Sequence, residues 1–471
     1  MLKSRLCIAF FAFAVGCAPA QKPLTDYVNP MLGTATLWDS VDLGFKPTKR
    51  TWGAEVFPGS SLPNAMVQVS PVTKFHSGAG YQYEDSVIYG FTHTNKGHWN
   101  LCHIPLLPVT GTPTPGDYCS PFSHERESAA PGYYQVFLDR YGVDAQLSST
   151  LRCAFHKYTY PAGAAASLLA DLQRSNEHVR AWDIRKEGDN VFAGWQQTGE
   201  KMYFYAVANR PVTGIEPVVE GDREVRIVRF GEGDGALELR IGFSFVSEKN
   251  ARENLEAEML GKSFAEVRSE ATATWNDLLG RIRVEGGTER EKGLFYSSLY
   301  RSFLWPALRS DVNGEFTDVD GKVINPGFRY YTGPSYWDDY RNKLILLGML
   351  APDVAADVIS SDTDKGEKRG GFMPTFFHGD HASAFVAGTY LRGNRGFDVN
   401  RAYNLVLRNA TVQGPSRPWL DEYIAKGYIS EMDVENPVTW TVCKAAVTKT
   451  LEYSYDDYAV ALLADALGDK E

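Results

Sequence analysis

Nine consecutive residues, Gly333-Pro-Ser-Tyr-Trp-Asp-Asp-Tyr-Arg341, hold two adjacent carboxylates, three aromatic rings and an arginine. A glycine and a proline interrupt regular structure just before them. Flat apolar rings beside carboxylates and a guanidinium suit a sugar, which offers apolar C–H faces and many hydroxyl groups. We therefore predict that Trp337, Asp338 and Arg341 bind a sugar. The alternative is an ordinary helix start with acidic capping residues and an Asp–Arg ion pair.

A second dense stretch, Phe376-Phe-His-Gly-Asp-His-Ala382, lies in the same half of the chain and precedes an apolar helical pattern. Its three polar side chains beside a glycine form a compact set of hydrogen-bond donors and acceptors. We predict that His378, Asp380 and His381 also contact the ligand. The alternative is that Asp380 caps the helix and the imidazoles merely flank it.

Three further candidates come from the first hundred residues. Trp52 lies in a glycine-rich stretch, and His93 and Trp99 lie in the segment from Gly90 to His103. The histidines of that segment are spaced by five residues, which fits neither a helical nor a strand pair of zinc ligands. We predict sugar contacts for Trp52, His93 and Trp99. The alternatives are strand-connecting loops and histidines satisfied within the fold.

The length and composition limit the class of protein. A chain of 471 residues exceeds what one core usually organises, so we expect at least two domains. The net charge is −10 and no long basic run occurs, which argues against nucleic acid as a partner. The aromatic content of 13% is typical of carbohydrate-active proteins, although many β-rich proteins share it.

The first twenty residues indicate export. Lys3 and Arg5 precede an apolar core, and Ala18-Pro-Ala20 provides a small-x-small cleavage site. Residues 1–20 are therefore predicted to be a signal peptide. In the alternative, Ala14-Val-Gly-Cys17 resembles a lipobox and Cys17 carries a lipid anchor. Either route leads to the periplasm or, as a lipoprotein, to the outer membrane or cell surface.

The remaining chain divides by its periodicity. Residues 21–250 alternate in short runs with glycine and proline turns, which predicts a β-sandwich. Residues 251–285 show helical spacing and are predicted to form a helical linker, and residues 286–471 are predominantly helical. Successive helices, among them 337–350, 438–451 and 455–467, favour an α/α toroid or bundle.

Several blocks, in this order, resemble glycoside hydrolase family 92, the secreted bacterial α-mannosidases. The blocks are Asp26-Tyr-Val-Asn-Pro-Met-Leu-Gly-Thr34, Phe57-Pro-Gly59, Val67-Gln-Val-Ser-Pro71, Gly80-Tyr-Gln-Tyr83, Gly90-Phe-Thr-His-Thr94, Tyr336-Trp-Asp-Asp-Tyr-Arg341, Gly370-Gly-Phe-Met-Pro374 and Thr450-Leu-Glu-Tyr-Ser-Tyr-Asp-Asp457. The resemblance implies an N-terminal β-sandwich, a helical linker and an (α/α)6 barrel, with the active site between the two domains. It also implies an exo-acting, inverting and calcium-dependent enzyme that acts on terminal α-mannosides of glycans, α-1,2 linkages among them.

The resemblance further implies a general acid in a Glu-Gly-Asn-x-Trp-Gln-Tyr block and a general base in a later Gly-Asn-Asp block. Neither block occurs in this sequence. We therefore expect the acid and base beyond Glu471, an incomplete barrel, and no mannoside hydrolysis by residues 21–471 alone. No calcium ligand can be assigned. The alternative functions are a non-catalytic glycan-binding protein and, third, a glycoside phosphorylase with the same pair of domains.

The export signal makes a testable prediction. The protein isolated from its own cells should begin at Gln21 or at a lipidated Cys17, because both processing routes remove the charged start and the apolar core. Intact-mass and N-terminal peptide mass spectrometry measures this directly. Recovery of a chain that still begins at Met1 from the cytoplasm would contradict the prediction.

Overall fold

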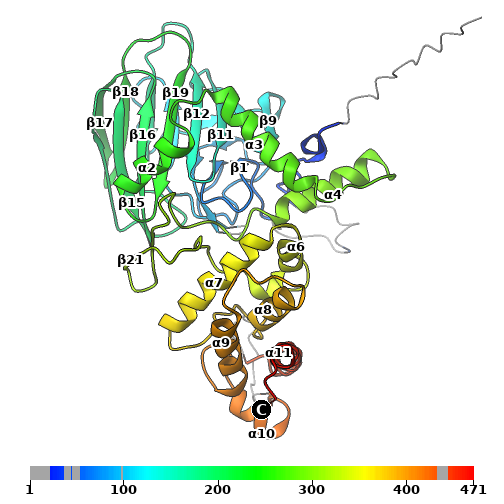
Figure 1. Ribbon diagram of the computed structural model, residues 1–471. Coiled ribbons are helices and arrows are strands. Elements are labelled where there is room, and N and C mark those ends of the chain that lie inside the picture. Colours follow the sequence, from blue (N-terminus) through cyan, green and yellow to red (C-terminus); the bar gives the residue numbers. More distant parts are fainter. Residues whose placement is uncertain (1–21, 37–43, 45–52, 97–98, 432–443, 471) are drawn as a thin grey trace, which may run out of the picture.

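The computed structural model describes residues 22–36, 44, 53–96, 99–431 and 444–470. Strands dominate up to Ser244 and helices dominate after it. In Figure 1 the β-rich half lies above most of these helices. This order confirms the predicted division into a β part and an α part. That the helices belong to an (α/α)6 barrel stays a prediction.

The β half consists of two antiparallel sheets packed face to face. One sheet has seven strands, in the spatial order β1 (Ser60–Ser61), β2 (Gln68–Val72), β4 (Gly90–Thr92), β7 (Leu106–Val109), β13 (Ser167–Ala170), β18 (Arg223–Phe230) and β17 (Val212–Glu220). The other has eight, in the order β14 (Ala181–Lys186), β15 (Val191–Gln197), β16 (Lys201–Ala208), β19 (Leu237–Ser244), β12 (Cys153–Thr159), β11 (Val143–Ser149), β10 (Tyr133–Leu138) and β9 (Glu127–Ala130).

The β half also contains shorter elements. They are the 3-10 turns η1 (Leu24–Tyr27) and η2 (His124–Arg126), and the strand pairs β3 (Val87–Ile88) with β8 (Ser120–Pro121) and β5 (Asn95–Lys96) with β6 (Trp99–Asn100).

The core is formed by the buried side chains that alternate with less buried ones along the strands. In β16 every second residue, from Met202 to Ala208, is buried, and the intervening residues are half-buried. Successive side chains of a strand point to opposite faces, so this pattern turns one face toward the other sheet. Residues of both sheets, including Phe204 and Leu168, belong to one continuous apolar cluster. Burial of that cluster is the main source of the sandwich's stability.

The predicted linker is two helices, α2 (Glu248–Glu258) and α3 (Phe264–Leu279), that pack on the outer face of the eight-stranded sheet. Ser247 caps α2, and Ser263 forms a capping box with Glu266 at the start of α3. A separate apolar cluster fills the space between these helices and the sheet. The second face of the sheet is thus buried as well.

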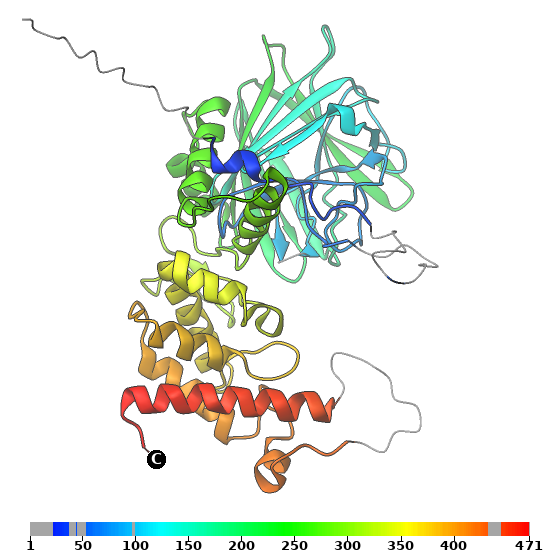
Figure 2. The ribbon, with the colours of Figure 1, turned by 90° about the vertical axis from the view of Figure 1, so that its right-hand side faces the viewer.

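The helical half is built from α4 (Glu289–Ser302), α5 (Tyr336–Asp339), α6 (Lys343–Leu350), α7 (Pro352–Lys368), α8 (Ala382–Leu391), α9 (Val399–Thr411), α10 (Leu420–Lys426) and α11 (Ala446–Leu467). Between α4 and α5 runs an irregular segment with the hairpin β20 (Phe316–Thr317) and β21 (Val323–Ile324). Helix α11 lies across α8 and α9, as Figure 2 shows. Among the described residues, no single helix combines the length and apolar character needed to cross a bilayer, and only the bent pair α6–α7 meets those criteria jointly.

Two helix predictions were wrong. The predicted helix 337–350 is divided into α5 and α6, because the Asn342 side chain accepts a hydrogen bond from the Lys343 N–H and starts a new helix there. The predicted helices 438–451 and 455–467 are replaced by the single helix α11 from Ala446, since nothing between residues 451 and 455 breaks it. Residues 438–443 lie outside the described residues.

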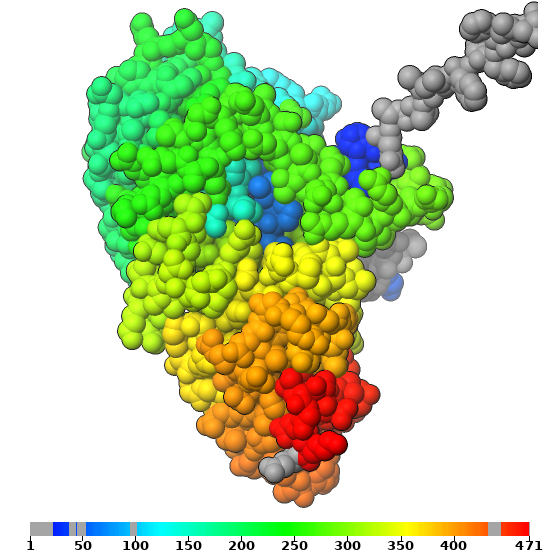
Figure 3. All heavy atoms as spheres, in the orientation of Figure 1, coloured from blue at the N-terminus to red at the C-terminus, as the bar shows by residue number. Residues whose placement is uncertain are grey.

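Side chains of the sandwich join the two halves. The Asn64 Nδ2 donates to the Pro306 carbonyl at 2.8 Å, and the Gln68 Nε2 donates to the Leu304 carbonyl at 2.7 Å. The backbone of Asn64 also bonds to Phe303 and Leu308. In Figure 3 the yellow-green segment between α4 and α5 occupies the space between the sandwich and the lower helices.

Trp275 should be the most important single side chain of α3. It is fully buried, stacks at 4.3 Å from Tyr300, and donates from Nε1 to the Ser61 carbonyl at 2.7 Å. Trp275→Ala should lower the free energy of unfolding by about 3–5 kcal/mol, because it leaves a cavity and an unpaired carbonyl. Urea unfolding followed by circular dichroism measures the change. Thr274→Ala, exposed on the same helix, is the control and should change stability by less than about 0.5 kcal/mol; equal effects would contradict the prediction.

Candidate functional site

The turn α5 separates the two adjacent carboxylates. Asp338 is exposed, whereas Asp339 is buried and its Oδ2 lies 2.7 Å from the Lys343 Nζ. Burial raises the pKa of Asp339, and the Lys343 ammonium opposes that shift. Asp339 therefore has a partner inside the protein, and Asp338 is the carboxylate that a ligand can reach.

The structure contains the helix start of the alternative interpretation, with Asp338 and Asp339 in the first turn of α5, but not its Asp–Arg ion pair. Within the described part of the chain no ion pair joins Asp338 to Arg341; the Arg341 guanidinium is exposed and lies 5.1 Å from the Tyr340 ring centroid. Asn342, not an aspartate, caps the following helix. The sugar-binding roles of Trp337, Asp338 and Arg341 stay predictions.

The second predicted stretch lies beside the first. The Trp337 ring meets Phe377 edge-on at a centroid distance of 6.1 Å and His378 at 6.4 Å. Phe376 and Phe377 are each 41% exposed. Trp337, Phe376, Phe377 and His378, which we call the aromatic rim, thus come from two segments 40 residues apart and form one surface next to α5. Exposed ring faces of this kind can pack against the C–H face of a sugar.

His378 adds a polar group to the rim. Burial lowers its pKa below the ordinary value, and so does the Lys449 ammonium, whose Nζ lies 3.3 Å from the His378 Nδ1. The lowered pKa favours the neutral imidazole, which carries one donor and one acceptor nitrogen. With Nδ1 accepting from Lys449, the Nε2–H can donate a hydrogen bond to a hydroxyl group.

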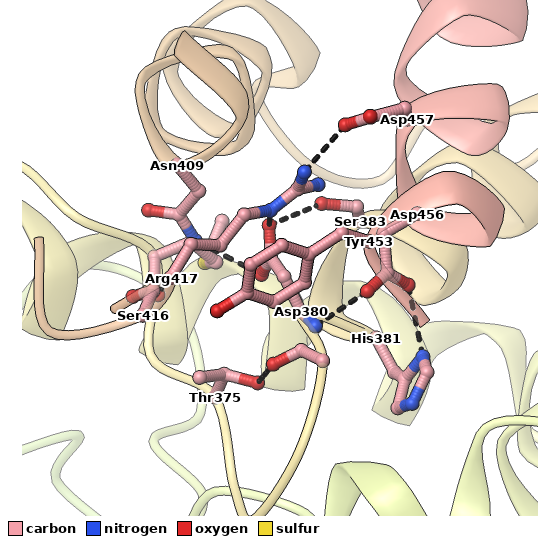
Figure 4. A network of polar contacts seen from close by, with 12 residues as sticks. Thr375, Asp380, His381, Ser383, Asn409, Ser416, Arg417, Tyr453, Asp456 and Asp457 are labelled. Carbon is pink, nitrogen blue, oxygen red and sulfur yellow. Dashed lines mark hydrogen bonds and ion pairs between the residues drawn. The ribbon is translucent and has the colours of Figure 1, made fainter. Parts of the chain in front are cut away.

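Asp380 and His381 lie behind the rim, which differs from their predicted role as ligand contacts. Both are fully buried. The Asp380 carboxylate accepts from Ser383 at 2.8 Å, from Asn409 at 2.9 Å and from the Arg417 Nε at 3.3 Å (Figure 4). Burial raises the pKa of Asp380, and Arg417 opposes the rise. With all these partners internal, Asp380 supports the rim and does not face a ligand.

His381 is held in the same way. Its Nδ1 lies 2.8 Å from the Asp456 Oδ1 and its Nε2 lies 2.9 Å from the Glu452 Oε2. The Tyr340 ring stacks on the imidazole at 3.8 Å. Both ring nitrogens and one ring face are therefore engaged by α11 and by the residue that follows α5. His381 ties these two elements together beneath the rim.

Sequence reasoning missed Arg417 and Asp456. Arg417 is fully buried and also pairs through NH1 with Asp457 (Figure 4). A signal for Asp456 was present: it falls at helical spacing with the apolar residues Tyr453, Val460 and Leu463, all of which are buried. A charge on the apolar face of a helix indicates a buried partner. No comparable pattern marks Arg417.

The N-terminal candidates are not at the rim. His93 is fully buried in the sandwich, where its Nε2 lies 3.0 Å from the Nε2 of the equally buried His156. The His156 Nδ1 lies 2.5 Å from the Tyr158 hydroxyl. His93 is thus an internal histidine of the fold, as in the alternative that the sequence left open. Trp52 lies outside the described residues, and of Trp99 only its place in β6 is described.

No calcium site can be built from these residues. The described parts of the chain contain no group of three or more His, Cys, Asp or Glu side chains that could hold a metal ion. The carboxylates beneath the rim already bond to arginine, lysine or histidine. The site therefore supplies aromatic surface, one exposed carboxylate and a neutral imidazole, which is chemistry for binding a polyhydroxylated ligand.

Comparison with known families decides the family. The N-terminal domain of glycosyl hydrolase family 92 matches residues 27–253, and its catalytic domain matches residues 250–471. The chain belongs to glycosyl hydrolase family 92. This confirms the resemblance read from the sequence blocks.

Solved structures agree with the family 92 assignment. A family 92 α-mannosidase from Bacteroides thetaiotaomicron is 27% identical with a TM-score of 0.84, and the match covers 96% of this chain and 63% of that one. That α-mannosidase is also known in complex with mannoimidazole. An inverting mannosidase of the family from Bacteroides thetaiotaomicron VPI-5482 shares the fold, with 24% identity, a TM-score of 0.81, and coverage of 96% of this chain and 64% of that one.

A curated relative is the "uncharacterized secreted glycosidase" of Arthroderma benhamiae. It is 24% identical over an alignment of 503 positions, gaps included, which covers 94% of this chain and 60% of the relative. The chain therefore spans about 60% of the length of this relative.

The buried histidine pair predicts acid sensitivity. Burial lowers the pKa of His93 to about 3, although hydrogen bonds to the backbone of His103 and Ile104 act in the opposite direction. Burial also lowers the pKa of His156. The unfolded chain, with histidine pKa values near 6.5, then binds more protons than the folded chain. The stabilisation is complete above pH 6.5 and is lost as the pH falls toward 3, by up to about 1.4 kcal/mol per pH unit for each histidine.

Urea unfolding at several pH values between 7.5 and 4.5 measures this slope. His93→Gln removes one of the titrating groups, so the slope of its unfolding free energy against pH should be shallower than that of the unaltered protein. A variant whose slope equals that of the unaltered protein would show that the pair does not titrate as inferred.

Proposed function

We propose that the protein acts as an exo-α-mannosidase that removes terminal α-mannosides, α-1,2-linked ones among them, from glycans outside the cytoplasm. The observation that carries this proposal is the aromatic rim beside the exposed Asp338 in a chain of family 92. A 27% identical α-mannosidase of that family supports the choice of mannose. The secreted relative and the predicted signal peptide support export.

The proposed mechanism assigns recognition to the described residues. The rim packs against the C–H face of the terminal mannose, Asp338 accepts hydrogen bonds from adjacent hydroxyl groups, and His378 exchanges a further hydrogen bond. A charged acceptor strengthens each hydrogen bond to roughly 1.5–3 kcal/mol. The inverting course, the calcium requirement and the helical barrel are part of the proposal by family resemblance alone.

A non-catalytic glycan-binding protein is the second candidate. It is favoured by the engagement of the carboxylates near the rim: Asp339 with Lys343, Asp380 with Arg417, and Asp456 with His381. These groups are positioned for support rather than for proton transfer. Release of mannose from aryl and disaccharide α-mannosides by the product of the complete coding sequence, compared with simple binding of methyl α-mannoside, separates the two candidates.

The Asp338→Asn variant tests the shared element of both candidates. It keeps the shape of the side chain but removes its charge, so loss of two charged hydrogen bonds should weaken methyl α-mannoside binding, and kcat/KM where turnover is measurable, by on the order of a hundredfold. Isothermal titration calorimetry and the Tm should be measured together. Asp338 is exposed, so the Tm should stay unchanged.

The matched control is Asp353→Asn. Asp353 is also exposed and lies in the first turn of a helix, α7, but outside the rim. It should bind methyl α-mannoside like the unaltered protein. If Asp338→Asn and Asp353→Asn behave alike, Asp338 has no role in sugar binding.

A further inference from the structure

The backbone that leads into α5 is bonded to helix α7 at both of its ends. At the first end, the Tyr331 N–H donates to the Ser361 Oγ at 3.0 Å, and the Tyr331 carbonyl accepts from the Lys365 Nζ at 3.0 Å. At the other end, the Tyr336 hydroxyl donates to the Asp362 Oδ2 at 2.5 Å. Three neighbouring residues on one face and turn of α7 therefore hold the loop 331–336.

The contact between Tyr336 and Asp362 lies in the interior. Asp362 is fully buried, Tyr336 is 2% exposed, and the Lys365 Nζ lies 2.8 Å from the Asp362 Oδ1. Burial and the Asp362 charge raise the pKa of Tyr336 well above its ordinary value, so the hydroxyl stays a donor. A buried charge and a buried hydroxyl are costly without partners, so each of the three groups depends on the others.

The loop also passes close over this ion pair. A side-chain carbon on Gly333 would lie 3.5 Å from the Asp362 Oδ1 and 3.9 Å from the Lys365 Nζ. From its other side the Trp305 Nε1 donates to the Gly333 carbonyl at 3.2 Å. The path of the backbone from Tyr331 to Tyr336 is therefore fixed along its length.

We propose that Tyr336, Asp362 and Lys365 form a clamp that positions Trp337 and Asp338 for recognition of the sugar. Tyr336 is the first residue of α5, and Trp337 and Asp338 follow it directly, so a displacement of the Tyr336 backbone moves both. The clamp residues do not touch the ligand; they act through Trp337 and Asp338. This inference rests on the proposed sugar-binding function, and it adds the residues that set the geometry of the site.

Two variants test the clamp. Tyr336→Phe keeps the ring and removes the hydroxyl, and Asp362→Asn keeps the shape and removes the charge. Each should weaken binding of methyl α-mannoside to the full chain about tenfold or more, because a small misplacement of binding groups is costly. Titrations are done well below the Tm of each variant, so that a loss of stability alone does not change the affinity.

The matched control is Tyr403→Phe, which removes a similar Tyr–Asp hydrogen bond, of 2.7 Å to Asp469, elsewhere in the helical half. It should leave the affinity unchanged. The double variant Tyr336→Phe/Asp362→Asn should bind no more weakly than Asp362→Asn, because the two residues act through one hydrogen bond. Full additivity of the two effects, or unchanged affinity in both single variants, would overturn the clamp.

Amide hydrogen exchange separates failure of the clamp from failure of the proposed function. Tyr336→Phe should speed exchange at the amides of α5 relative to Tyr403→Phe, whether or not a mannoside binds. If the unaltered chain does not bind methyl α-mannoside, the proposed function fails. If it binds and Asp338→Asn weakens binding, while Tyr336→Phe changes neither exchange nor affinity, the clamp alone is wrong.

Discussion

The arrangement of the two halves depends on buried peptide groups whose hydrogen bonds are not made within a helix or a sheet. Between α4 and α5 the chain runs through an irregular segment against the sandwich, where water is excluded, and a buried N–H or C=O must find a partner. Asn64 and Gln68 supply those partners with side-chain amides that reach the carbonyls of Leu304 and Pro306. Hydrogen bonds from a side-chain amide are directional. These two bonds therefore fix the course of the chain toward α5 and also supply the buried carbonyls with donors.

The same requirement governs the charges beneath the rim. Arg417 and Asp380 are both fully buried, and a buried charge that lost its partner would cost several kcal/mol. Each charge therefore constrains the element that carries its partner. His381 links the segment before α8 to α11, while Asp362 links α7 to α5. The aromatic rim and Asp338 lie over this interior of paired charges, and this explains how short, irregular segments can present rings and a carboxylate in a defined geometry.

Sequence patterns predicted those parts of the molecule that depend on local order. The alternation within residues 21–250 predicted the strands of the sandwich, such as β10 and β16, and the helical spacing of residues 251–285 predicted α2 and α3. The site was predicted less well. The same dense group of polar residues in a sequence can face either a ligand or buried partners, and the local pattern does not distinguish the two. Asp380 bonds to Arg417, 37 positions away, and His381 to Asp456, 75 positions away. Only the folded chain brings such partners together, so the sequence of this stretch alone could not show that Asp380 and His381 are buried.

The adjacent carboxylates of α5 show how one turn buries one carboxylate and exposes its neighbour. Consecutive residues of a helical turn point about 100° apart, so Asp338 and Asp339 cannot both face one ligand. Asp339 points inward to Lys343, and this leaves Asp338 at the surface. An inverting glycosidase needs two carboxylates about 6.5–9.5 Å apart on opposite sides of the scissile bond. The turn exposes one carboxylate, whose proposed role is binding, so the acid and the base that hydrolysis needs must be two other carboxylates.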